Sequence, residues 1–321
     1  MRTATTSVIL AHLAAAGLVG CPGNGTTGLT DTSTPAATTP APATPSATAT
    51  TTAAATGEAG IGDVCKTDDD CKGELECQLE FDGANFSEAG TCTDQPVIYE
   101  GRPLLVDGRA HVAPLRSSAG WLDGSGDERK PTTLDERQRH HWARLLTVAA
   151  QDEHASIPSF ARALCLLVSL GAPANLVAKT QHAIGDEIRH ARLCATWAER
   201  LGAAASEPGP LPEAIAPFAG SQPGVALLDD VFWGGCVGET LAAHRMQARA
   251  STAPLAELGE VMAAIADDEA RHAALAFETV RWLIDRDVSL RDRLDEHLLR
   301  FASTASEGDR ATLTPLLAVL S

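Results

Sequence analysis

The sequence is short of basic residues. It has 25 lysines and arginines against 42 aspartates and glutamates, which gives a formal net charge of −17. A protein that binds DNA or RNA needs a basic face, so this balance argues against nucleic acid as a partner. Much of the acidity is local, because residues 58–94 contain eleven acids and two lysines, a net charge of −9. We interpret that acidity as a solubility feature of this segment.

Long apolar runs are also scarce. The run at residues 8–19 is too short to span a bilayer, and no later stretch approaches 18 continuous apolar residues, so we expect no membrane-spanning helix. Arg2 precedes the run, as in a targeting segment. The run ends in Leu18-Val19-Gly20-Cys21, which resembles a bacterial lipobox. The resemblance implies cleavage before Cys21 and acylation of that residue, hence a membrane-anchored lipoprotein of the bacterial cell envelope, periplasmic or surface-exposed. An ordinary signal peptide or a stray cysteine is the alternative.

Composition divides the chain into six segments. They are a lipoprotein signal peptide at 1–20, a disordered stalk at 21–57, a small acidic cysteine-rich module at 58–94, an extended connecting segment at 95–132, a helical domain at 133–303 and a tail at 304–321. The stalk is rich in Thr, Ala and Pro and has a single charged residue, Asp31. Such a segment cannot bury enough apolar surface to offset its ordering entropy. Its prolines extend it away from the membrane.

The cysteine-rich module has four cysteines in an even, dense set: Cys65, Cys71, Cys77 and Cys92. In an exported protein this pattern predicts two disulfides, with three pairings open. Zinc is the rival interpretation, but the sequence contains no Cys-x-x-Cys. In the connecting segment, the apolar run 104–106 before Asp107-Gly108 permits a hairpin or a strap lying against the helices.

Helices dominate after Thr133. Thr133 and Glu136 form a capping-box pattern at the start of the first helix, which ends near Gly171. We expect further helices at 174–202, 225–249 and 254–284, and a shorter fifth helix from Ser289 to about 301. The predicted fold is therefore all-α, with four long helices arranged as a bundle.

The segment Asp-Glu-x-Arg-His occurs twice, at 186–190 and at 268–272, and each copy follows a helix with an isolated glutamate, Glu153 or Glu239. A single Glu-x-x-His is common by chance, whereas two matched copies with matched partners are not. Four carboxylates and two imidazoles are the ligand set of a two-metal centre inside a four-helix bundle. The predicted ligands are Glu153, Glu187, His190, Glu239, Glu269 and His272.

Chain geometry brings these residues to one level. Glu153 lies 18 residues before the turn at Gly171 and Glu187 lies 16 after it, depths of roughly 27 and 24 Å at 1.5 Å per residue. Glu239 and Glu269 lie 14 and 16 residues from a turn near Ala253, roughly 21 and 24 Å deep. Four buried carboxylates need compensation. Two divalent cations provide it, whereas a solvent-facing set of acids does not fit the apolar residues around both motifs.

From these motifs, residues 134–285 resemble the ferritin-like superfamily of di-iron and di-manganese carboxylate proteins. The resemblance implies a ferritin-like four-helix bundle with a short fifth helix and two iron ions, manganese being the alternative. It also implies that Asp186 accepts a hydrogen bond from His272 and Asp268 from His190, with Arg189 and Arg271 neutralising the aspartates. Many relatives carry a tyrosine seven residues after the first glutamate. Phe160 and Met246 occupy those positions here, so we expect no tyrosyl radical.

The resemblance implies oxidative chemistry: Fe(II) oxidation, peroxide reduction or O₂-dependent oxidation of a small substrate. The alternative is a metal-stabilised structural or binding protein of the envelope, with the cysteine-rich module recognising a partner. Cys194 and Cys236 share the ligand face and could be soft ligands, a disulfide or small core residues. Pro158 must disturb its helix, which either opens a path to the metals or is merely tolerated.

Overall fold

We analysed a computed structural model of the chain. It describes residues 4–15, 55–56, 64–65, 72–73, 76–81, 86–93, 101–106, 109–117, 120–122, 133–204, 207–215 and 222–320. The described chain is mostly helical, so the all-α prediction is confirmed at this level. It separates into two compact units. The larger holds residues 1–19, 81–87 and 96–321, and the smaller holds residues 20–80 and 88–95.

The described part of residues 55–93, most of which belongs to the smaller unit, consists of short strands. They are β1 (Ala55–Thr56), β2 (Val64–Cys65), β3 (Lys72–Gly73), β4 (Glu76–Phe81) and β5 (Phe86–Thr93). Strand β5 lies between β2 and β4 in a three-stranded sheet, and β1 pairs with β3. The predicted stalk has only β1 within the described residues. Cys71 lies outside them, as do the side chains of Cys65, Cys77 and Cys92, so the disulfides remain a prediction.

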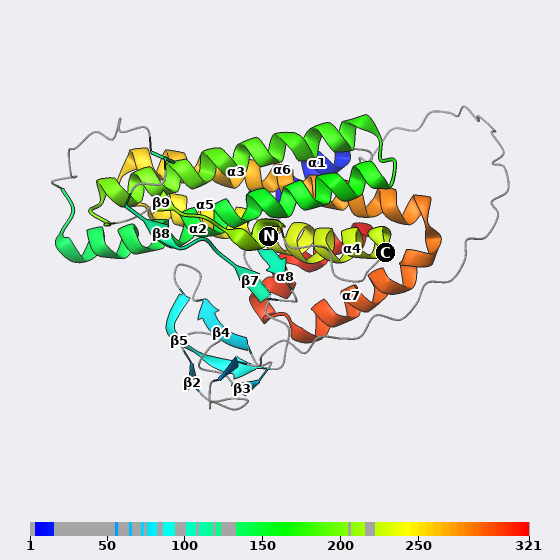
Figure 1. The fold of residues 1–321 in the computed structure, drawn as a ribbon, viewed down its shortest axis with the longest axis horizontal. Coiled ribbons are helices and arrows are strands. Elements are labelled where there is room, and N and C mark those ends of the chain that lie inside the picture. Colours follow the sequence, from blue (N-terminus) through cyan, green and yellow to red (C-terminus); the bar gives the residue numbers. More distant parts are fainter. Residues whose placement is uncertain are drawn as a thin grey trace. The chain divides into compact units, whose positions relative to one another are not determined.

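Two long helices begin the helical domain. Helix α2 (Glu136–Ser169) and helix α3 (Ala174–Arg200) run antiparallel and side by side (Figure 1). The predicted capping box at Thr133 is wrong, because Asp135 caps α2 by accepting from Gln138 N, and the Gln138 side chain contacts Asp135 N in return. Gly171, with φ of +70°, turns the chain after α2, where Ala172 N donates to Leu167 O.

The second half of the domain has a long, irregular helix. Helix α4 (Pro223–Asp230) leads into the π-helix η3 (Val231–Glu239), which continues as α5 (Thr240–Thr252). Helix α6 (Ala256–Arg286) runs back against η3 and α5, and it also contacts α3. The sequence predicts one plain helix at 225–249, so the π-helical segment is a correction.

The C-terminal residues fold onto the domain. After the short 3₁₀ turn η4 (Val288–Leu290), α7 (Arg291–Thr304) is followed by α8 (Glu307–Leu317) and the 3₁₀ turn η5 (Ala318–Leu320). Asp287 caps η4 by accepting a hydrogen bond from Ser289 N. Leu313, Leu316 and Leu320 are buried. The segment predicted as a tail at 304–321 is therefore largely helical and belongs to the core.

The connecting segment forms short strands. Strands β6 (Leu104–Val106) and β7 (Arg109–His111) pair antiparallel, as predicted for a hairpin. Strand β8 (Leu115–Arg116) pairs with β9 (Glu207–Pro208), and η2 (Pro212–Ile215) follows in the long connection after α3. Arg162 Nη1 donates to Leu105 O and Gln151 Nε2 to Ala113 O, so this segment is bonded to α2.

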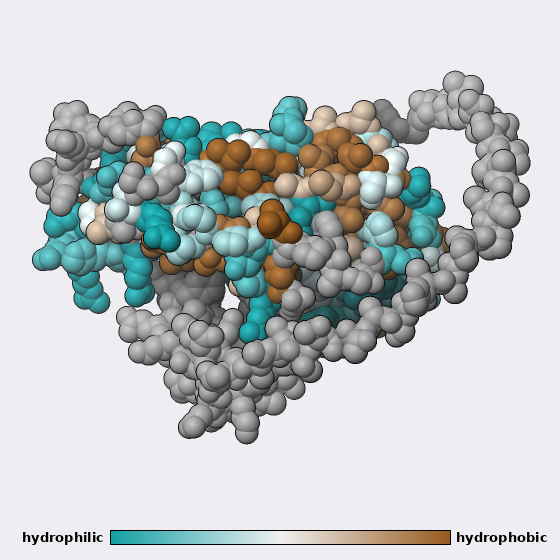
Figure 2. Space-filling view, in the orientation of Figure 1, coloured by the Kyte–Doolittle hydropathy of each residue, from teal (hydrophilic) through white to brown (hydrophobic). Residues whose placement is uncertain are grey.

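Helix α1 (Ala4–Ala15) contains the described part of the N-terminal apolar run, and it packs against α6. Ile9 is fully buried there. Residues 18–21 lie outside the described part of the chain, so the lipobox prediction has no structural test. Among the described residues, no helix combines the length and apolar character needed to cross a membrane. Apolar and polar side chains both reach the face of the helical domain seen in Figure 2.

Candidate metal centre

Four helical segments each deliver part of one polar cluster. Glu153 comes from α2, Glu187 and His190 from α3, Glu239 from the end of η3, and Glu269 and His272 from α6. Residues three apart share a helix face, so each paired glutamate points the same way as its histidine. The structure brings all six residues predicted from the sequence into this cluster.

The cluster divides into two overlapping ligand groups. Glu153, Glu187, His190 and Glu269 form the first group, and Glu187, Glu239, Glu269 and His272 form the second. Within each group one ligand atom per residue lies within 4.8 Å of all the others. Glu187 and Glu269 belong to both groups, so each of their carboxylates has one oxygen to offer to each group. Spacing along the chain does not show this sharing.

Both histidines turn the same nitrogen toward the carboxylates. His190 Nδ1 lies 3.0 Å from Glu269 Oε1 and 3.5 Å from Glu153 Oε2. His272 Nδ1 lies 3.0 Å from Glu187 Oε1 and 3.4 Å from Glu269 Oε2. Each imidazole therefore offers Nδ1 to one ligand group and keeps Nε2 for another partner.

That partner is an aspartate from the opposite motif. His190 Nε2 lies 3.0 Å from Asp268 Oδ2, and His272 Nε2 lies 3.2 Å from Asp186 Oδ2. These are the pairings that the family resemblance implies. An aspartate acceptor leaves the proton on Nε2 and Nδ1 free to bind a metal.

Two arginines close the outer side of the cluster. Arg189 contacts Asp186 at 2.8 Å and also pairs with Asp268. Arg271 Nη1 donates to Asp268 at 2.6 Å, and its Nη2 lies 3.5 Å from Asp186. Each arginine thus touches both aspartates. This geometry matches the neutralising role expected from the resemblance.

The buried charges shift one another's proton affinity. Burial, then the Glu269 carboxylate, raises the pKa of Glu153 and of Glu239 well above the usual range. Burial also tends to raise the pKa of Glu269, but the positive charge of His272 and the close approach of Glu239 and His190 outweigh burial and lower it. For Asp268, burial is likewise outweighed, here by His190 and Arg271, and its pKa falls. Burial and the nearby Glu269 carboxylate therefore disfavour the charged forms of Glu153 and Glu239.

Buried polar atoms that form no hydrogen bond indicate whether the cluster is suited to metal ions. Five buried side-chain atoms of the cluster make no hydrogen bond of regular geometry among the described residues, although the two imidazole nitrogens lie 3.0 Å from a carboxylate oxygen: Glu187 Oε1, His190 Nδ1, Glu239 Oε1, Glu269 Oε1 and His272 Nδ1. Native proteins leave few such groups, and each needs an explanation. These five are carboxylate oxygens and imidazole nitrogens, the donors that divalent transition metals prefer. The residues present therefore fit a pair of metal ions.

The cluster forms a polar layer between two apolar cores. On α6, Ile265 and Ala266 belong to one core, Ala270 and Ala273 to the other, and Glu269 lies between them. Five of the six predicted ligands are at most 3% exposed, while the Glu153 side chain is 12% exposed. Access from solvent is therefore greatest on the α2 side.

The π-helix η3 delivers Glu239 and contains three glycines, Gly234, Gly235 and Gly238. Each glycine costs a helix about 1 kcal/mol relative to alanine, so η3 needs support from its surroundings. A Cβ on Gly235 would lie 2.3 Å from Ala276 Cβ of α6, which explains one of them. π-Helical turns are frequent at functional sites.

A buried arginine near the site escapes prediction from the sequence. Arg102 is 3% exposed and pairs with Asp230, its Nε lies 3.3 Å from Ser159 Oγ, and its guanidinium lies 4.4 Å from the Phe160 ring centroid. The Phe160 ring is edge-on to His272 at 5.2 Å. In the sequence, the only sign that the segment around Arg102 packs against the helices is the apolar run that follows it, Leu104-Leu105-Val106.

Other residues near the motifs stay outside the ligand groups. Cys194 and Cys236 are free and buried, and burial raises the pKa of both thiols. Neither belongs to a ligand group found among the described residues. The two cysteines are therefore small core residues, which was one of the three alternatives predicted from the sequence.

Two further residues near the motifs also stay outside the ligand groups. The His154 ring is edge-on to the Trp121 ring at 4.9 Å, and Pro158 lies within an uninterrupted α2.

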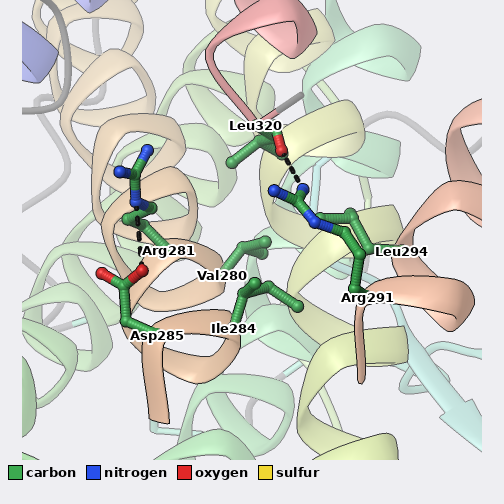
Figure 3. Close-up of a pocket in the computed structure, with 7 residues that line it drawn as sticks. All are labelled: Val280, Arg281, Ile284, Asp285, Arg291, Leu294 and Leu320. Atoms are coloured by element: carbon green, nitrogen blue, oxygen red, sulfur yellow. Dashed lines mark hydrogen bonds and ion pairs between the residues drawn. The ribbon is translucent and has the colours of Figure 1, made fainter. Parts of the chain in front are cut away.

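A separate cavity of about 120 Å³ lies farther along α6 (Figure 3). Its lining residues are Val280, Arg281, Ile284, Asp285, Arg291, Leu294 and Leu320. Arg281 pairs with Asp285 at 3.5 Å, and Arg291 Nη1 donates to Leu320 O at 2.5 Å. Eight residues separate His272 from Val280, about 12 Å of helix rise, so this cavity is distinct from the polar cluster.

Comparison of the chain with protein-family models, curated proteins and solved structures found no match.

Proposed function

We propose that this chain is a ferritin-like protein with a dinuclear metal centre, most simply two iron ions, that catalyses oxidative chemistry. In this proposal α2, α3, η3 with α5, and α6 are the four helices of a ferritin-like bundle, and α7 is the short fifth helix. The antiparallel pairing of α2 with α3 and the packing of α6 on α3, η3 and α5 support this arrangement.

One observation carries the proposal. The two buried ligand groups share Glu187 and Glu269, and each group adds one further carboxylate and one imidazole Nδ1. Two ligand groups that have Glu187 and Glu269 in common fit a pair of ions better than a single ion. Charge agrees, because two divalent cations neutralise four carboxylates that would otherwise be buried at high cost.

The chain's own residues would hold and tune the pair. Glu153 and His190 would hold one ion, and Glu239 and His272 the other, with Glu187 and Glu269 reaching both. Asp268 and Asp186 fix the two rings by accepting from Nε2. Two iron ions would supply electrons for reducing O₂ or peroxide. The surrounding apolar cores exclude water from this layer.

A rapid-mixing experiment tests the chemistry. Chelator-treated protein is loaded anaerobically with two equivalents of Fe(II) and mixed with O₂ in a stopped-flow spectrometer. Its iron should oxidise faster than Fe(II) in buffer, and Glu269→Ala should remove the acceleration. Electron paramagnetic resonance should show no tyrosyl radical, because Phe160 and Met246 are not tyrosines. A rate no faster than in buffer would contradict the oxidative role.

The second candidate is a metal-stabilised structural or binding protein of the envelope. The burial of five of the six ligands favours it, because a metal that supports a fold needs no opening to solvent. In that case the protein should bind two ions tightly and unfold more readily after chelation, without accelerating Fe(II) oxidation. The stopped-flow experiment therefore separates the two candidates.

We also propose that the chain is an exported lipoprotein. Acylated Cys21 would attach it to a membrane, the Thr/Ala/Pro-rich segment 21–57 would act as a stalk, and Cys65, Cys71, Cys77 and Cys92 would form two disulfides. The lipobox-like Leu18-Val19-Gly20-Cys21 and the even number of cysteines support this. The metal centre would then face an oxidising compartment.

A further inference from the structure

We propose that Arg102 is a positioning residue for the second ligand group of the metal centre, the one that contains Glu239 and His272. It acts on Glu239 through the π-helix η3 and on His272 through Phe160. The inference rests on the proposed metal centre, and it adds a residue outside the four metal-carrying helical segments.

Residues 101–102 contact both ends of η3. Gly101 N donates to Gly238 O at 3.0 Å, one residue before Glu239. Arg102 pairs with Asp230, the residue immediately before η3. A single dipeptide therefore fixes the spacing between the start and the end of the π-helical segment.

The approach at Gly238 is close enough to require glycine, and the approach at Gly234 is tight. A Cβ on Gly238 would lie 1.9 Å from Gly101 O, and a Cβ on Gly234 would lie 3.0 Å from Arg102 Cγ. A π-helix also disrupts the regular pairing of backbone carbonyls, which must find other donors when buried. Gly101 N supplies one donor, and Thr240 Oγ1 supplies another to Cys236 O at 2.7 Å.

The hydrogen-bond register of η3 determines where the Glu239 side chain points, because Glu239 is the last residue of η3. A π-helical turn accommodates an extra residue, so a return to α-helical bonding would rotate Glu239 by about 100° relative to Asp230. A rotation of that size would turn the carboxylate away from the cluster. The bonds from Gly101 to Gly238 and from Arg102 to Asp230 hold both ends of η3 and therefore oppose this rotation.

The arginine side chain reaches the second group by another route. Its guanidinium lies 4.4 Å from the Phe160 ring centroid, and the same ring is edge-on to His272 at 5.2 Å. One residue, Phe160, therefore separates Arg102 from His272, while the neighbouring Gly101 bonds to the residue before Glu239. Among the contacts described for Arg102 there is none with Glu153 or His190, so its effect should fall on the second group.

A cobalt titration tests the assignment. Full-length protein freed of metal is titrated with Co(II), and bound metal per chain and the visible spectrum are measured. Wild-type protein should bind two ions, and Arg102→Met should retain only one. Arg102→Lys keeps the charge beside Asp230 and so protects the fold. It loses the Ser159 contact and the planar guanidinium, and should bind the second ion about 10-fold more weakly.

The matched control is Arg293→Met. Arg293 pairs with Asp229, the neighbour of Asp230, at 2.9 Å, so its loss also breaks an arginine–aspartate contact on α4. It should keep two cobalt ions and the wild-type spectrum. The inference is overturned if both Arg102 variants bind two ions with unchanged affinity and spectrum, or if Arg293→Met loses an ion equally. A wild-type protein that takes up no cobalt would contradict the metal centre itself.

Discussion

His190 and Asp268 join the two halves of the site: Nε2 on α3 lies 3.0 Å from Oδ2 on α6. The contact between His272 and Asp186, at 3.2 Å, repeats it in the opposite direction. Each aspartate thus belongs to the helix that carries the other histidine. The two motifs are therefore coupled, and a change in one aspartate should be felt at the histidine of the other motif.

Asp268→Asn should weaken metal binding by about 10- to 100-fold, because an amide accepts the Nε2 proton less strongly and no longer neutralises Arg189 and Arg271. Competition with a coloured chelator measures the change. Asp267→Asn is the matched control, since Asp267 is the exposed neighbour on the same helix. Equal affinities for the two variants would contradict the role given to Asp268.

Glu269→Ala should abolish binding of both ions, because Glu269 belongs to both ligand groups, whereas Glu239→Ala should remove one ion. Elemental analysis of desalted protein gives metal per chain. Glu260→Ala, at an exposed position of α6, should bind as wild type does. Undiminished metal in both Glu269→Ala and Glu239→Ala would show that the site is assigned wrongly.

Asp229 should contribute to the pH dependence of stability. Burial tends to raise its pKa, but hydrogen bonds from His297 (2.7 Å) and Arg293 outweigh burial and lower it. A lowered folded-state pKa stabilises the protein above the unfolded value, near pH 4, and this contribution disappears as the pH falls through the folded-state pKa.

Asp229→Asn should therefore lose about 1–3 kcal/mol of unfolding free energy at pH 7, and its stability should fall less steeply below pH 4. Urea unfolding at several pH values measures both effects. The exposed Asp295→Asn on α7 serves as control and should change neither. Parallel stability curves for wild type and Asp229→Asn would refute the prediction.

Cys21→Ser should release the protein from membranes into the soluble fraction, because it removes the acylation site that the lipobox resemblance implies. Fractionation of cells and immunoblotting measure the distribution. Membrane association that persists unchanged would mean that the anchor lies elsewhere.

Thiol labelling should separate two classes of cysteine. Without reductant, Cys65, Cys71, Cys77 and Cys92 should resist labelling even in denaturant, because disulfides protect them. Cys165 is exposed and should label in the native protein, whereas buried Cys194 and Cys236 should label only on unfolding. Mass spectrometry of peptides identifies each site. Labelling of all four module cysteines, reversed by zinc, would favour a zinc site.

The positions of the ligands could be predicted from the sequence because helices are periodic. Residues 187 and 190 must share a face of any helix, and similar distances from a turn place Glu153 and Glu187 at nearly the same level. The same local rules gave the bounds of α2, α3 and α6 to within a few residues. They gave the wrong N-cap, because Asp135 and Thr133 offer similar capping patterns and only the surrounding packing selects between them.

Only the tertiary structure decided what depends on contacts distant in sequence. That Glu187 and Glu269 belong to both ligand groups follows from how α3 and α6 pack, which spacing along each helix does not encode. The π-helical register of η3 depends on a backbone bond from Gly101, 137 residues away. Helix α8 buries Leu313, Leu316 and Leu317 in a core shared with helices distant in sequence, and a short helix gains most of its stability from such packing.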